Sequence, residues 1–148
     1  MGTLYIVAIP IGNLKDITIR AIEILKTVDY VICEDTRVTG RLLNAYSISA
    51  KMQVLNDFNE EKRVAQIVSS LKATQNLVLV CDAGTPLVSD PGYKLVREAI
   101  KNGIKIESIP GPSSVIVALT VSGMPPDKFT FLGYLPKKNG KRKEVLEN

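Results

Sequence analysis

The chain alternates between short apolar runs and helical patterns, and this alternation restricts the folds open to it. Five apolar runs have the length of strands: residues 4–9, 30–33, 52–55, 77–81 and 104–109. A loop and then a helical pattern follow each run; over residues 60–73, for example, apolar side chains recur at positions i, i+3, i+4 and i+7. The alternation predicts an α/β fold, a mainly parallel sheet with helices on both faces. We expect a further strand over residues 129–134.

The composition is that of a globular protein, with 45% hydrophobic and 23% charged residues in a chain of 148. No apolar run approaches the ~20 residues that a membrane span needs. The first residues lack the basic region and the long apolar core of a signal peptide. We therefore expect a cytoplasmic protein without a membrane partner. Cys33 and Cys81 each lie in an apolar run, so we expect buried thiols and no disulfide.

The chain contains no histidine, which excludes catalytic triads built on an imidazole. Two cysteines cannot supply the four ligands of a structural zinc ion, so we expect no metal site. Any general base must be Asp, Glu, Lys, Tyr or water. The net charge of +4 is concentrated in residues 137–148, where five Lys or Arg face two Glu. Such a basic end can bind phosphates, or it can be a solvated tail or helix start.

The loops that follow the apolar runs are rich in Gly, Pro, Asp and Asn. They span residues 10–16, 34–37, 56–59, 82–92 and 110–114. Because the carboxyl ends of parallel strands share one edge of a sheet, we expect these loops to gather at one rim, where α/β proteins bind ligands. The loop 82–92 exceeds the two to six residues of an ordinary connection, and two prolines stiffen it. This favours a ligand-binding loop over a simple strand-to-helix connection.

The first loop does not have the pattern of a dinucleotide site. It contains one glycine, Gly12, where the dinucleotide fingerprint needs three, and the chain has no P-loop. A nicotinamide cofactor or ATP is therefore a poor fit. A ligand with a nucleoside but no phosphate suits these loops better.

Three residues of the loop 82–92 have more than one reading. The Asp82 carboxylate can accept a hydrogen bond from a ribose hydroxyl or brace backbone amides of the loop. Gly84 permits a positive φ or a close backbone approach. For Asp90 we favour the role of N-cap of a helix whose first residue is Pro91 over a role in the site.

Two other loops carry polar candidates. Ser113 and Ser114 either cap the helix that follows or donate to a ligand carboxylate at its N-terminus. Arg37, next to Glu34 and Asp35, forms an ion pair at the rim or holds a phosphate with its fork of N–H groups.

Several motifs in fixed order carry a family resemblance. They are PIGNL at 10–14, EDTRVTG at 34–40, DAGTPLVSDPG at 82–92, PGPS at 110–113 and GYLP at 133–136. Together they closely resemble the RsmI-type ribosomal RNA small-subunit methyltransferases, of the tetrapyrrole-methylase-like class of S-adenosylmethionine enzymes. The resemblance implies methylation of a cytidine ribose 2′-hydroxyl in the decoding region of 16S rRNA, in the 30S subunit, by a homodimer.

The family fold has two α/β domains with the cofactor between them. On this resemblance, residues 1–136 are the N-terminal methyltransferase domain, and residues 137–148 are the basic start of a connection to a missing C-terminal domain. The isolated chain can therefore be inactive. Two alternatives remain open: a methyltransferase of the same fold that acts on a small tetrapyrrole-like substrate, or a non-catalytic fragment that dimerises or binds RNA.

The resemblance also implies contacts to S-adenosyl-L-methionine. These contacts are Ile11, Ala83, Gly84, Thr85, Val88, Ser113 and Ser114. We add Asp82 to them as a further candidate for cofactor binding. The loop 56–59 departs from the family, which commonly has histidines there, and of its residues only Asn59 matches the usual pattern. A catalytic imidazole in this loop is therefore not available.

Transfer of a methyl group to a ribose hydroxyl needs an acceptor for the hydroxyl proton. A carboxylate can take that proton, and our candidate is Asp35, with Glu34 as the second choice. Basic and polar side chains would position the RNA backbone. For this role we single out Arg37, Asn59, Lys137, Lys138 and Arg142.

Overall fold

A computed structural model describes residues 1–56 and 59–147 and divides the chain into two compact units. The first unit, Met1–Ser114, contains all the strands of the sheet, and the second begins at Val115. Asp57 and Phe58 of the loop 56–59 lie outside the described residues.

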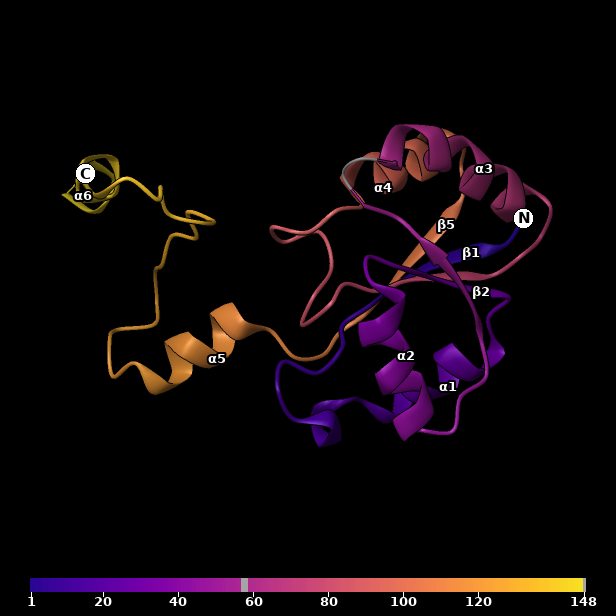
Figure 1. The fold of residues 1–148 in the computed structure, drawn as a ribbon, viewed down its shortest axis with the longest axis horizontal. Helices are drawn as coiled ribbons and strands as arrows, with labels where there is room; N and C mark the ends of the chain where they lie inside the picture. The colour runs from indigo at the N-terminus through magenta and orange to yellow at the C-terminus, as the bar shows by residue number, and fades with distance from the viewer. Residues whose placement is uncertain (57–58, 148) are drawn as a thin grey trace. The chain divides into compact units, whose positions relative to one another are not determined.

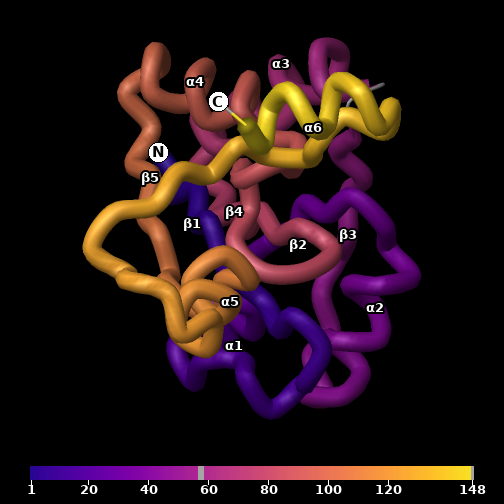
Figure 2. Tube along the Cα trace, turned by 90° about the vertical axis from the view of Figure 1, so that its left-hand side faces the viewer, coloured from indigo at the N-terminus to yellow at the C-terminus, as the bar shows by residue number. Residues whose placement is uncertain are grey.

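The first unit is built on a five-stranded sheet in which every pair of neighbours is parallel. In chain order the strands are β1 (Thr3–Val7), β2 (Tyr30–Cys33), β3 (Lys51–Val54), β4 (Leu77–Leu79) and β5 (Lys105–Ile109). Across the sheet they lie in the order β3-β2-β4-β1-β5, which Figure 2 shows from one side. The predicted α/β fold with a parallel sheet is confirmed.

The helices cover both faces of the sheet, two on each. They are α1 (Ile19–Thr27), α2 (Thr36–Ala45), α3 (Glu60–Lys72) and α4 (Tyr93–Lys101), with a short 3-10 turn, η1 (Leu14–Asp16), before α1. Figure 1 shows α1 and α2 on one side and α3 and α4 on the other. From β1 to β3 the chain moves across the sheet in one direction, and from β3 to β5 it moves back. Because such crossovers are right-handed, the reversal places the later helices on the opposite face.

Successive residues of a strand point their side chains to opposite faces of the sheet, so alternate residues pack against the helices on each face. Leu4, Ile32 and Leu79 pack with α3 and α4 in one buried cluster. Val31 and Val78 pack with α1 and α2 in the other. The central strands are therefore apolar along their whole length, which explains why the sequence reads there as continuous apolar runs.

Helix α4 begins later than its sequence suggests. We expected Asp90 as N-cap and Pro91 as first residue, and this prediction was wrong. The helix begins at Tyr93, after Gly92, whose φ of 117° is left-handed and whose position carries no side-chain cap. A carboxylate from another helix, Glu60, serves the α4 N-terminus in place of a local cap.

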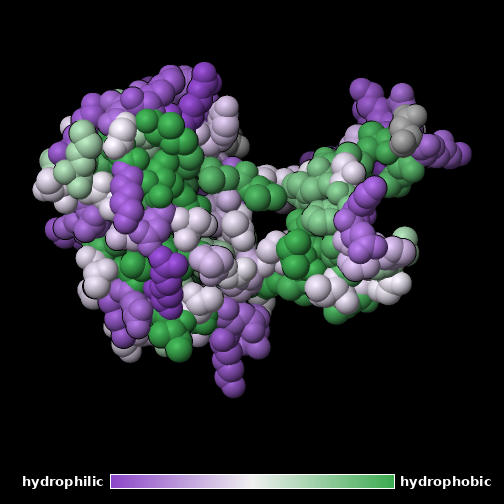
Figure 3. Space-filling model, turned by 180° about the vertical axis from the view of Figure 1, so that it is seen from behind, coloured by the Kyte–Doolittle hydropathy of each residue, from purple (hydrophilic) through white to green (hydrophobic). Residues whose placement is uncertain are grey.

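The second unit contains most of α5 (Ser114–Val121) and α6 (Asn139–Glu147). Residues 129–134 do not form the strand that we expected. Large apolar side chains of this unit are exposed, among them Val121, Met124, Leu132 and Tyr134, and Figure 3 shows apolar surface here. Within the described part of the chain, no helix is both long and apolar enough to span a membrane.

The backbone at Gly92 generates a stability prediction. A Cβ there would lie 2.6 Å from Cδ2 of the buried Leu79, and the φ of 117° strains any side chain. We expect Gly92→Ala to lower the free energy of unfolding by about 3 kcal/mol or more, from strain and overpacking together.

Gly103→Ala is the matched control, measured in the same urea denaturation series. Gly103 has a φ of 68°, and nothing lies within 4 Å of its added Cβ. The control should lose only about 1–2 kcal/mol, the cost of a left-handed L-residue. Equal losses for the two variants would contradict the close packing at Gly92.

Candidate functional site

The expected rim exists, and the loop 82–92 is its centre. This loop follows β4, the middle strand of the sheet. The connections after β1 and β2, the neighbours of β4, lead to helices on one face, whereas the connection after β4 leads to the other face. A crevice opens where adjacent connections diverge in this way, and open α/β sheets bind their ligands there.

Backbone hydrogen bonds join the loop 82–92 to Ile9, which lies shortly after Val7, the last residue of β1. The Ile9 amide donates to the Gly84 carbonyl at 2.9 Å, and the Gly84 amide donates back at 3.0 Å. Gly84 has the positive φ, 81°, that its sequence context suggested. A Cβ at Gly84 would come within 3.2 Å of the Ile11 side chain, so the two loops touch here.

Side chains of the loop 82–92 reach the remaining neighbours. The Thr85 hydroxyl donates to the Pro112 carbonyl at 3.1 Å, which joins the loop 110–114. The Asp82 carboxylate accepts from the Asp35 amide at 3.3 Å, which joins the loop after β2. The amide that Asp82 braces therefore belongs to the loop after β2, whereas the expectation was an amide of its own loop.

The Cys81 thiol is hydrogen-bonded to backbone carbonyls of the loop 82–92. It lies 3.2 Å from the Ala83 carbonyl and 3.4 Å from the Gly84 carbonyl. Burial raises the pKa of the Cys81 thiol to about 12, and burial likewise raises that of Cys33. Both cysteines are free and buried, as expected, and are unreactive thiols at neutral pH.

The proposed cofactor contacts fall into two groups. Ile11, Gly84 and Thr85 are joined by the contacts above, and Ser113 follows the Pro112 carbonyl that Thr85 binds. Ala83 and Val88 are exposed on the loop 82–92, and Ser114 is exposed at the first turn of α5. The role of these residues as cofactor contacts stays a prediction.

Two cavities meet at Asp82. One, of about 180 Å³, is lined mainly by apolar residues of the first loop and of α2. The other, of about 420 Å³, is lined by polar residues that include Glu34, Asp35, Arg37 and Asn56. Asp82 thus lines both a mainly apolar cavity and a polar cavity.

Asp35 is engaged on both carboxylate oxygens. It caps α2 by accepting from the Arg37 amide at 2.8 Å, and it binds Nε and Nη2 of the Arg37 guanidinium at 3.0 and 2.6 Å. These bonds, the side-chain bond first, lower the pKa of Asp35 to about 2. A carboxylate held ionised in this way is a weak base, so the local geometry favours orientation of Arg37 as its main task.

Asn59 is hydrogen-bonded to the end of β3 and to Asn56. Its side-chain oxygen accepts from the Asn56 amide at 2.9 Å, and its side-chain nitrogen donates to the Val54 carbonyl at 3.3 Å. The Asn56 side-chain oxygen in turn accepts from the Asn59 amide at 3.1 Å. These bonds shape the connection after β3, whereas the RNA contact expected of Asn59 stays a prediction.

The basic candidates of the C-terminal region belong to the second unit. Lys137 and Lys138 precede α6, and Arg142 lies within it, with its guanidinium bonded to the Asn139 side chain. Their expected role in RNA binding also stays a prediction.

Sequence reasoning missed Glu60. It is 5% exposed, and its Oε1 accepts from the Gly92 amide at 3.2 Å and the Lys94 amide at 3.0 Å. In the helical pattern over 60–73 it reads as a first-turn acid on the solvent side. No local signal identifies it, because its partners lie more than thirty positions away along the chain.

The Asp35–Arg37 pair generates a pH prediction. A lowered pKa means that the pair is fully formed above the ordinary Asp value of 3.8 and is lost as the pH falls through about 2. Carboxyl ¹³C NMR should therefore show Asp35 titrating near pH 2. Arg37→Ala should move the titration towards 3.8, and Arg41→Ala, on the same helix, should leave it low. A midpoint near 3.8 in the unsubstituted protein would contradict the pairing.

Comparisons with known proteins agree with this architecture. The family model described as Tetrapyrrole (Corrin/Porphyrin) Methylases matches residues 3–148. Uroporphyrin-III-C-methyltransferase from Thermus thermophilus superposes on 84% of this chain and 53% of its own, with a TM-score of 0.62. At 21% sequence identity, that likeness concerns the fold alone.

Curated relatives are more similar in sequence. The chain is 47% identical to ribosomal RNA small subunit methyltransferase I of Escherichia coli O157:H7 over 146 residues, 99% of this chain and 51% of that protein. It is 51% identical to the protein of the same name from Mesorhizobium japonicum, over 97% of this chain and 49% of the relative. The chain thus spans about half the length of these relatives. The family match and the parallel sheet with its loop-lined rim show that the chain belongs to the tetrapyrrole methylase family.

Proposed function

We propose that the natural protein containing this chain methylates the 2′-hydroxyl of a cytidine ribose in the decoding region of 16S rRNA, with S-adenosyl-L-methionine as methyl donor. The observation that carries the proposal is the 47–51% identity, over nearly this whole chain, to proteins named ribosomal RNA small subunit methyltransferase I. The choice of nucleotide and hydroxyl rests on the motif resemblance. The substrate would be the 30S subunit and the enzyme a cytoplasmic homodimer.

The rim has the chemistry that an adenosine-containing sulfonium needs. Exposed Ala83 and Val88 offer apolar contact, and Ile11 packs against the backbone at Gly84. The Asp82 carboxylate, at the wall of the mainly apolar cavity, suits a ribose hydroxyl or a positive charge. Ser113 and Ser114 can donate to a carboxylate. The cofactor would supply an electrophilic methyl group, and these residues would bind and orient it.

The polar cavity is our candidate for the ribose of the substrate. Two of its carboxylates, Asp35 and Glu34, are the proposed acceptors of the hydroxyl proton. Because its pKa is lowered to about 2, Asp35 is a weak base at neutral pH, so we assign it mainly the orientation of Arg37 and keep Glu34 as the second proposed acceptor of the proton. Alignment of the hydroxyl with the methyl group and exclusion of water would supply most of the rate enhancement.

RNA contacts are proposed for the cationic and amide side chains at the rim and in the second unit. The Arg37 side chain is 83% exposed, so its guanidinium remains accessible to a phosphate while Asp35 orients it. Asn59, Lys137, Lys138 and Arg142 would add further backbone contacts. The likeness to the uroporphyrin enzyme concerns the fold alone, so it gives no support to a tetrapyrrole substrate.

A methylation assay tests the proposed function directly. The natural full-length protein, labelled S-adenosylmethionine and unmethylated 30S subunits should give label in 16S rRNA. Mapping should place the label on a cytidine 2′-hydroxyl. Label on a base, or in a precorrin mixture but not in 30S subunits, would contradict the proposal.

Replacement of Arg37 tests the proposed RNA contact. Arg37→Ala should raise the KM for 30S subunits roughly 10-fold. The slope of the logarithm of the binding constant against the logarithm of salt concentration should become shallower by about one, the contribution of one phosphate contact. The dissociation constant for S-adenosylmethionine should not change.

Arg20→Ala is the control, because Arg20 is also exposed and paired, with Glu107 on β5. It should leave both quantities unchanged. An Arg37→Ala enzyme with normal KM would remove Arg37 from the RNA site.

A further inference from the structure

Glu60 is a buried carboxylate that α3 presents to another helix. Burial of an ionised group is unfavourable unless hydrogen bonds compensate for the lost water. Here the Oε1 atom accepts from the amides of Gly92 and Lys94, at 3.2 and 3.0 Å. These amides belong to the N-cap residue and the first turn of α4, where backbone donors have no partner within the helix and where the helix dipole favours negative charge.

The backbone of Glu60 is hydrogen-bonded to the connection after β3. Its backbone amide donates to the Asn56 carbonyl at 2.9 Å. Asn59, the residue before it, is bonded to Asn56 and to Val54 at the end of β3. Glu60 therefore connects the loop that borders the polar cavity with the end of the loop 82–92.

The segment that Glu60 holds is conformationally strained. Leu87 and Ser89 have φ values of 77° and 65°, which non-glycine residues rarely adopt, and Gly92 has 117°. Such conformations persist only when surrounding contacts impose them. Gly84 and Thr85 are bonded at the upstream end, and the Glu60 carboxylate binds the downstream end. Between these attachments lies Val88, a proposed cofactor contact.

We propose that Glu60 is a positioning residue, which holds the loop 82–92 in its cofactor-binding conformation against the loop after β3. The inference rests on the proposed function for the identity of the ligand, S-adenosylmethionine. Glu60 itself touches backbone amides and would act through the loop. Without the two hydrogen bonds to Glu60, the loop 82–92 would sample other conformations. Only a fraction of the protein would then be in the conformation that binds the cofactor, and the apparent affinity would fall to that fraction of the intrinsic affinity.

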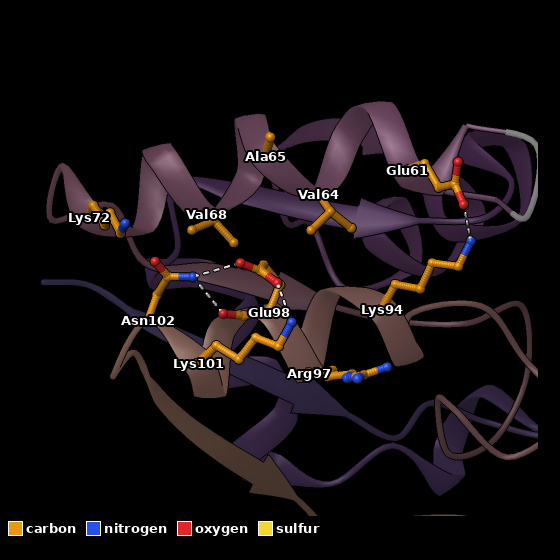
Figure 4. Close-up of a pocket in the computed structure, with 10 residues that line it drawn as sticks. All are labelled: Glu61, Val64, Ala65, Val68, Lys72, Lys94, Arg97, Glu98, Lys101 and Asn102. Atoms are coloured by element: carbon orange, nitrogen blue, oxygen red, sulfur yellow. Dashed lines mark hydrogen bonds and ion pairs between the residues drawn. The ribbon is translucent and has the colours of Figure 1, made fainter.

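The neighbouring Glu61 provides a matched control. Its carboxylate binds Nζ of Lys94 at 2.9 Å, so it joins the same two helices. Unlike Glu60, it is 81% exposed and lies at the edge of a groove of about 550 Å³ between α3 and α4 (Figure 4). Loss of this surface pair should leave the loop unchanged.

The test compares Glu60→Ala, Glu60→Gln and Glu61→Ala in the natural full-length protein. Hydrogen exchange reports the order of residues 83–94, and calorimetry reports the dissociation constant for S-adenosylmethionine. Glu60→Ala should speed exchange over 83–94 and weaken binding at least 10-fold. Glu60→Gln keeps an oxygen acceptor, so it should retain most of the protection and affinity. Glu61→Ala should match the unsubstituted protein in both measurements.

The variant Val68→Ala distinguishes a positioning role of Glu60 from a contribution to global stability alone. Val68 lies on the same helix in the buried cluster, so its truncation lowers global stability without altering the Glu60 bonds. If Glu60→Ala and Val68→Ala change cofactor affinity and loop exchange equally, the positioning role is overturned. It is also overturned if Glu60→Gln behaves like Glu60→Ala in both measurements. Failure of the unsubstituted protein to bind S-adenosylmethionine would overturn the proposed function instead, while exchange over 83–94 would still show whether Glu60 orders the loop.

Discussion

Right-handed crossover connections are the constraint on which the arrangement of the first unit depends. The chain crosses the sheet from β1 to β3, returns to insert β4 in the centre, and continues to β5. Given one hand, the return places α3 and α4 on the face opposite α1 and α2. The same return makes the connection after β4 diverge from those of both neighbouring strands. The rim crevice is therefore a result of strand order as much as of the residues that line it.

Within that crevice, the loop 82–92 is bonded to the loops after β2 and β5 and to residues that adjoin the loops after β1 and β3. Gly84 binds Ile9 just after β1, Thr85 binds the loop 110–114, Asp82 binds the loop after β2, and Gly92 binds Glu60 beside the loop after β3. Two of the four attachments use backbone atoms of glycine, and two use side chains of the loop itself. A long connection is thereby held in a defined shape, which explains how a segment with two positive-φ non-glycine residues can form part of a binding site.

The sequence predicted much of this fold because its strongest signals are local. Continuous apolar runs and the 3.6-residue period of α3 depend on neighbours in the chain, so the parallel sheet and the rim loops were predictable. Asp90 and Glu60 show the limit. A local cap at Asp90–Pro91 was a reasonable expectation, yet a carboxylate from α3 satisfies the amides of α4. Residues 129–134 have strand-like composition but form no strand in the second unit, since a strand needs a partner that composition does not specify.

The central position of β4 also has a consequence for the order of folding. β1 and β2 do not pair with each other; each is bonded to β4, which follows them by more than forty residues. Until Leu77–Leu79 is in place, the β1 strand and the β2–β3 pair have no common sheet. Closure of such sequence-distant contacts is entropically costly and slows folding. The rim is thus assembled only when the sheet is, so a nascent chain acquires its candidate site and its two-sided core in the same late step.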